Sequence, residues 1–107
     1  MKKQARRTPA LSREKIISIL KKELPYLKEK YGVERIVLYG SFAKGNPKKS
    51  SDVDILVEFK GRATFDRFMD TKFYLEELLG RKVDLVTLKA IKPRMKPYIM
   101  QDLVHVA

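Results

Sequence analysis

The sequence contains no cysteine and no tryptophan, and His105 is its one histidine. The absence of cysteine excludes disulfides, thiolate zinc sites and cysteine nucleophiles. No apolar run approaches the roughly 20 residues that span a bilayer, and the basic first ten residues are not followed by the apolar segment of a secretory signal. We therefore expect a cytoplasmic protein with no membrane contact, in which His105 has a structural or surface role.

The chain is short and strongly basic. Its 107 residues include 24 Lys and Arg against 13 Asp and Glu, which gives a formal charge of +11. This length allows one domain, so a large substrate would have to be held by another chain. We predict a basic flexible arm over residues 1–10 and a single domain over 11–107. The positive charges are spread along the chain, so nucleic acid would bind only nonspecifically, if at all.

Apolar residues at helical spacing predict two helical regions. Ser12 is typical of an N-cap, but Pro25 predicts a break, after which a second short helix would end at Gly32. A longer helix is predicted between Thr64, as its N-cap, and Gly80, as the residue after its last turn. The apolar stripe predicted for this helix consists of Phe65, Phe68, Lys72, Leu75 and Leu79.

Runs rich in β-branched and aromatic residues predict strands at 34–39, 52–59 and 82–87, with a terminal edge strand at 104–106. Residues 40–51 are predicted to form a loop that contains one helical turn from Ser41, and a short helix is expected near 97–102. With the helices outside, this order predicts an α/β (α+β) domain in which a mixed β-sheet carries helices on one side.

Three aspartates occupy the predicted strands. Asp52 and Asp54 are two positions apart, so their carboxylates leave the same face about 6.6–7 Å apart. If the strand at 82–87 pairs beside them, Asp84 lies next to this pair. Each aspartate alone is typical of a solvated surface residue, but three converging charges repel one another and favour a bound cation. Carboxylate ligands without His or Cys favour Mg²⁺ or Mn²⁺ over zinc.

Gly40 and Ser41 follow the first strand directly. Taken alone, this pair is typical of an ordinary turn. Glycine also lets the backbone approach a ligand closely, and Ser41 opens a turn whose N–H groups can bind an anion. With Lys44, Lys48 and Lys49 in the same loop, the segment predicts a phosphate-binding site opposite the metal site. This combination is typical of phosphoryl or nucleotidyl transfer.

The spacing Gly40-Ser41, ten residues, Asp52-x-Asp54 resembles the signature of the DNA polymerase β-like nucleotidyltransferase superfamily. The short chain and the segment Gly-Arg-Lys-Val-Asp-Leu-Val at 80–86 resemble its minimal nucleotidyltransferase (MNT) branch. The resemblance covers roughly residues 31–88. It implies a nucleotidyltransferase fold.

The resemblance also implies residue roles. Asp52 and Asp54 would ligate the divalent metals that bind the nucleoside triphosphate. Asp84 would complete the second metal site and help to activate the acceptor hydroxyl. Gly40 and Ser41 would hold the β- and γ-phosphates.

By the same resemblance, the protein would transfer AMP from ATP to a tyrosine hydroxyl of a HEPN-type ribonuclease toxin and act as its antitoxin in a hetero-oligomer. Lys44 stands where this family usually has arginine, which predicts weaker phosphate orientation. Three alternatives remain: an antitoxin that acts by binding alone, an aminoglycoside-type small-molecule nucleotidyltransferase, and a nucleic-acid-binding module.

Overall fold

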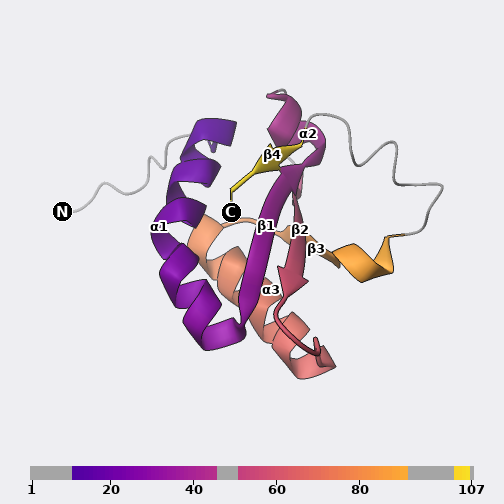
Figure 1. The fold of residues 1–107 in the computed structure, drawn as a ribbon. Coiled ribbons are helices and arrows are strands. Elements are labelled where there is room, and N and C mark those ends of the chain that lie inside the picture. Colours follow the sequence, from indigo (N-terminus) through magenta and orange to yellow (C-terminus); the bar gives the residue numbers. More distant parts are fainter. Residues whose placement is uncertain (1–10, 46–50, 92–102, 107) are drawn as a thin grey trace.

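The computed structural model describes residues 11–45, 51–91 and 103–106. Two long helices, α1 (Arg13–Tyr31) and α3 (Phe65–Leu79), cover one face of a four-stranded sheet (Figure 1). This arrangement confirms the predicted fold class. The predicted arm at 1–10 and the predicted short helix at 97–102 lie outside the described residues.

The sheet has the strand order β3-β2-β1-β4. Its strands are β1 (Val33–Tyr39), β2 (Val53–Phe59), β3 (Val83–Thr87) and β4 (Val104–His105). β1 pairs antiparallel with β2 and β4, whereas β2 pairs parallel with β3, so the sheet is mixed as expected. The parallel pairing places the first residues of β2 and β3 side by side at one end of the sheet.

Helix α1 runs unbroken through Pro25, so the predicted break was wrong. A proline inside a helix costs about 3 kcal/mol, because the carbonyl four residues earlier loses its partner. Here that carbonyl belongs to Lys21, and both residues lie on the exposed side of the helix. Leu20 and Leu27 flank the proline and are fully buried. Burial of two leucine side chains, about 1.5–3 kcal/mol each, offsets the loss.

The predicted helix caps are confirmed. Ser12 and Thr64 each accept a hydrogen bond of 3.1 Å from the backbone N–H three residues later. Gly32 and Gly80 follow the last turns of α1 and α3 in the left-handed conformation, with φ of 70° and 66°. These local signals set both ends of each long helix.

The apolar stripe of α3 differs from the prediction. Its buried residues are Thr71, Leu75 and Leu79, which follow one another at intervals of four. Phe65 is 76% exposed because it precedes Thr71 by six positions, which places it about 120° away around the helix. The Thr71 hydroxyl donates a hydrogen bond of 2.7 Å to the carbonyl of residue 67. Burial of this threonine therefore leaves its hydroxyl donor paired.

The core lies between the sheet and the two long helices. On β2, the alternate residues Val53, Ile55, Val57 and Phe59 are buried. They pack with Ile16, Leu20 and Leu27 of α1, Leu75 and Leu79 of α3, and Ile36 and Leu38 of β1. Over the described ranges, no helix combines the length and apolar character needed to cross a bilayer.

Candidate active site

Three polar residues form one row across the sheet. In the strand register, Tyr39 of β1 lies opposite Asp54 of β2, and Asp54 lies opposite Asp84 of β3. Paired residues share a sheet face, and neighbours along a strand point to opposite faces. Because Val53 and Ile55 point into the core, the row lies on the face away from the long helices. The strand pairing expected for Asp84 is therefore present.

Asp54 has a strongly perturbed ionisation. Partial burial is the largest cause, and the charges of Asp84 and Asp52 add to it; a side-chain hydrogen bond with Asp84 acts in the same direction. Together they raise the pKa of Asp54 to about 6. Two carboxyl groups this close must share a proton or a cation, so the pair favours a bound positive charge.

Asp52 does not join this pair directly. It lies one residue before β2 and is exposed, although its charge contributes to the raised pKa of Asp54. Within the described segments, no three Asp, Glu or His side chains are gathered closely enough to form a metal-binding group. The structure thus brings Asp54 and Asp84 together and leaves Asp52 at the solvent-facing start of β2, where water screens its charge.

Gly40 connects the predicted phosphate-binding turn to the aspartates. It begins the short helix α2 (Gly40–Lys44), one residue before the expected start at Ser41, and has φ of 75°. A Cβ atom at this position would lie 2.9 Å from Cγ of Asp54 and closer still to Oδ2. Any other residue would displace the Asp54 carboxylate. Ser41 follows and is half-buried.

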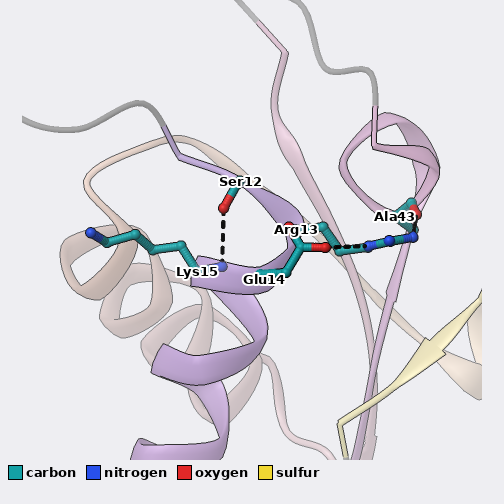
Figure 2. Close-up of polar contacts among 5 residues, drawn as sticks. All are labelled: Ser12, Arg13, Glu14, Lys15 and Ala43. Carbon is teal, nitrogen blue, oxygen red and sulfur yellow. Dashed lines mark hydrogen bonds and ion pairs between the residues drawn. The ribbon is translucent and has the colours of Figure 1, made fainter.

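Buried side chains and one long-range hydrogen bond hold α2 in place. Its residues Phe42 and Ala43 are buried in the core. Arg13, at the start of α1, donates a hydrogen bond of 3.1 Å from Nη1 to the Ala43 carbonyl and pairs with Glu14 at 3.3 Å (Figure 2). The guanidinium thus satisfies a carbonyl in the last turn of α2. Lys44 is exposed, and Lys48 and Lys49 lie outside the described residues.

Glu76 of α3 fixes the start of β3. Its carboxylate accepts a hydrogen bond of 3.0 Å from the backbone N–H of Val83 and one of 2.9 Å from Nζ of Lys72. The hydrogen bond from Val83 is the largest cause that lowers the pKa of Glu76, followed by Lys72. Because Val83 immediately precedes Asp84, this contact helps to position the second aspartate of the pair.

Tyr39 is a site residue that the sequence analysis missed. It is half-buried, and burial followed by the charges of Asp84 and Asp54 raises the pKa of its hydroxyl. The phenol can donate a hydrogen bond on this face. Its place directly before Gly40 was the available signal, but its alignment with Asp54 depends on the strand register.

The chemistry of the donor set fits a hard divalent cation. Mg²⁺ is commonly held by one or two carboxylates together with water and substrate phosphates. Asp54 and Asp84 supply two carboxylates in direct contact, and Asp52 adds a third negative charge nearby. The exposed carboxylate of Asp84 faces solvent, so a substrate can reach it.

Residues 15–106 match the family described as "Nucleotidyltransferase domain". The protein adenylyltransferase MntA of Thermococcus cleftensis is 38% identical over 96 residues, which are 90% of this chain and 97% of the relative. A solved structure provisionally described as a minimal nucleotidyltransferase has a TM-score of 0.74 at 27% identity, covering 90% and 97% of the two chains. A tri-AMPylated Shewanella oneidensis HEPN toxin in complex with an MNT antitoxin contains a chain of similar fold. Its TM-score is 0.62 at 17% identity, covering 85% of this chain and 71% of that one.

Proposed function

Because this chain belongs to the nucleotidyltransferase domain family, we propose that it is an antitoxin that transfers AMP from ATP to a tyrosine hydroxyl of a HEPN-type ribonuclease toxin. The observation that carries this proposal is that Asp54 contacts both Gly40 and Asp84, because this arrangement would join a cation site to a turn that can approach phosphate. The relative named a protein adenylyltransferase supports AMP transfer to a protein. The fold shared with an MNT antitoxin bound to a HEPN toxin supports the partner class.

Asp54, Asp84 and Asp52 would hold Mg²⁺ or Mn²⁺ together with the triphosphate. When bound, the metal supplies the positive charge that neutralises the phosphates and the departing pyrophosphate. Gly40 leaves the space in which the phosphates approach Asp54, and Ser41 donates to the β- and γ-phosphates. The polypeptide contributes mainly position and charge, as in other phosphoryl transfers.

In the transfer itself, the acceptor oxygen forms a bond to the α-phosphorus of ATP. The bond from that phosphorus to the oxygen that bridges to the β-phosphate breaks, and pyrophosphate leaves. The acceptor proton passes to Asp84, whose exposed position suits contact with an incoming hydroxyl. Asp54 is half-buried against Gly40, which suits a ligand that stays in place.

The acceptor would come from another chain. The described residues form one sheet and its helical layer, and among them there is no separate lobe that could hold an acceptor. A partner protein that presents a tyrosine would complete the wall of the site. We therefore expect a hetero-oligomer with the toxin.

A transfer assay tests this function. The protein is incubated with the HEPN-type toxin, Mg²⁺ and ATP labelled in the α-phosphate, and AMP on the toxin is measured by mass spectrometry. We expect Asp52→Ala and Asp54→Ala to abolish labelling, while Asp70→Ala, an exposed aspartate on α3, leaves it unchanged. Label on the toxin should disappear when its acceptor tyrosine is replaced by phenylalanine. Equal labelling by Asp54→Ala would contradict the catalytic assignment.

The alternative that the protein neutralises the toxin by binding alone is tested in the same system. EDTA and Asp54→Ala should both remove protection of RNA from the toxin at substoichiometric antitoxin, because one enzyme molecule can modify many toxin molecules. Protection that survives both treatments and requires equal amounts of the two proteins would favour binding alone.

A further inference from the structure

Arg81 connects three parts of the candidate site. It lies between the end of α3 and the start of β3, three residues before Asp84. Its Nη1 atom donates a hydrogen bond of 2.9 Å to the carbonyl of Ser51, the residue that precedes Asp52. Its guanidinium carbon lies 5.5 Å from the centre of the Phe42 ring in α2.

These contacts add to a backbone bridge at the same place. The N–H of Val53 donates a hydrogen bond of 2.9 Å to the carbonyl of Lys82. Asp52 therefore lies between two residues, Ser51 and Val53, that are both tied to the segment 81–82. The carboxylate of Asp52 remains exposed, but its backbone has a defined position relative to β3.

The Phe42 ring gives the arginine a fixed support. Phe42 is 1% exposed and directly follows Ser41. A guanidinium within about 6 Å of an aromatic ring is attracted to its face, and the same guanidinium can also donate hydrogen bonds to groups beside the ring. The contact thus relates the position of the Gly-Ser turn to the position of Asp52.

We propose that Arg81 is a positioning residue: by joining the Ser51 carbonyl to the Phe42 ring, it holds Asp52 at the distance from Gly40 and Ser41 at which a metal–nucleotide complex binds. This inference rests on the proposed function and deepens it. Arg81 acts through Asp52 and needs no contact with the substrate.

The test compares two replacements of similar length. Arg81→Met keeps the packing against Phe42 but has no donor for the Ser51 carbonyl, whereas Arg81→Lys keeps both a donor and a charge. Arg62→Met, at an exposed position in the turn after β2, is the matched control. Amide hydrogen exchange of Val53 is measured without metal or nucleotide. Mn²⁺ binding in the presence of ATP is measured by electron paramagnetic resonance, and AMP transfer is measured last.

For Arg81→Met we expect Val53 to exchange about 10-fold faster and Mn²⁺·ATP affinity to fall about 10- to 100-fold, the usual effect of losing a residue that orients a ligand. Arg81→Lys should stay within about 3-fold of the wild type, and all variants should keep a similar Tm. Val53 exchange and Mn²⁺ binding unchanged in Arg81→Met would overturn the proposal. So would losses in both Arg81 variants that simply follow a lowered Tm.

Should Arg81→Met fail to fold, Arg81→Leu provides the same comparison, because leucine also lacks a donor for the Ser51 carbonyl and keeps an apolar side chain beside Phe42. The proposed function can fail separately. Absence of Asp54-dependent AMP transfer in the wild type would refute it, while the Val53 exchange measurement would still decide whether Arg81 fixes the start of β2.

Discussion

The two faces of the central sheet differ sharply although they share the same strands. On one face, Leu38 and Ile55 are fully buried beneath the long helices. One step along each strand, on the opposite face, Tyr39 and Asp54 stand in line with Asp84. Because side chains alternate along a strand, one residue separates a position that stabilises the fold from one that carries the chemistry.

The two faces also differ in what folding does to them. Burial of apolar side chains on the helix face favours the folded state. On the carboxylate face, folding brings Asp54 against Asp84 and partly removes it from water, which raises the pKa of Asp54 to about 6. At neutral pH this ionised pair disfavours folding until a cation binds. The candidate site therefore depends on stability supplied by the other face.

The largest expected effects come from changing neighbouring residues on opposite faces. Asp54→Asn should reduce AMP transfer by about 1,000-fold or more, because a neutral amide no longer holds the cation, and should leave the fold intact. Ile55→Ala should lower the free energy of unfolding by about 2–5 kcal/mol. Its specific activity should stay near that of the wild type at a temperature where the variant is folded. Urea denaturation measures the stability of both variants, and the transfer assay measures their activity. A loss of activity in fully folded Ile55→Ala would contradict the separation of roles.

Gly40→Ala should have the next largest effect. The left-handed φ costs about 1–2 kcal/mol for alanine, and the added methyl group must push Asp54 aside. We expect AMP transfer to fall roughly 100-fold, because the displaced Asp54 carboxylate would no longer be positioned to bind the metal. Gly61→Ala is the control, because Gly61 has φ of 78° and no neighbouring atom within 4 Å of an added Cβ. It should lose similar stability but no activity. Equal activity of the two variants would mean that the Gly40–Asp54 contact is unimportant.

A smaller effect is expected on stability as a function of pH. The pKa of Asp54 is higher in the folded protein than its ordinary value of 3.8, so the folded state binds the proton more tightly. The stabilisation of the folded state by the protonated Asp54 carboxyl is fully present below about pH 4 and is lost as the pH rises through about 6. Asp54→Asn should therefore match the wild type near pH 4 and melt about 3–6 °C higher at pH 7.5 without metal, after allowing for solvent screening.

Added Mn²⁺ should then raise the Tm of the wild type at pH 7.5 and leave that of Asp54→Asn unchanged, because only the wild type binds the ion. Differential scanning fluorimetry over this pH range measures both effects. A constant difference in Tm between the two proteins from pH 4 to 7.5 would show that Asp54 titrates normally in the folded state.

The smallest expected effect is at Lys44. This exposed lysine occupies the last turn of α2, where arginine would supply a bidentate donor for phosphate. We expect Lys44→Arg to lower the KM for ATP by about 3-fold with little change in kcat, consistent with one additional hydrogen bond of modest strength. Steady-state kinetics with Lys60→Arg, another exposed lysine, provides the comparison. An unchanged KM would indicate that Lys44 does not contact the triphosphate.

Most of the fold follows from local patterns in the sequence. The caps at Ser12 and Thr64 correctly predict where the two long helices begin, because these signals act between near neighbours in the chain. The break predicted at Pro25 failed because burial of Leu20 and Leu27 is a tertiary effect. Phe65 falls in the predicted stripe but is exposed, because a stripe read from the sequence alone does not reveal which side of α3 meets the sheet.

By itself, the sequence determined the Gly40-Ser41 and Asp52-x-Asp54 spacing, the face on which Asp54 lies and the resemblance to nucleotidyltransferases. Only the tertiary structure decided that Asp54 meets Asp84, that Tyr39 completes their row and that Arg81 reaches Ser51. The physical reason is distance along the chain. Alternation and capping involve residues a few positions apart, whereas the contacts of Asp54 with Asp84 and of Arg81 with Ser51 each join residues 30 positions apart, after strand register has been set.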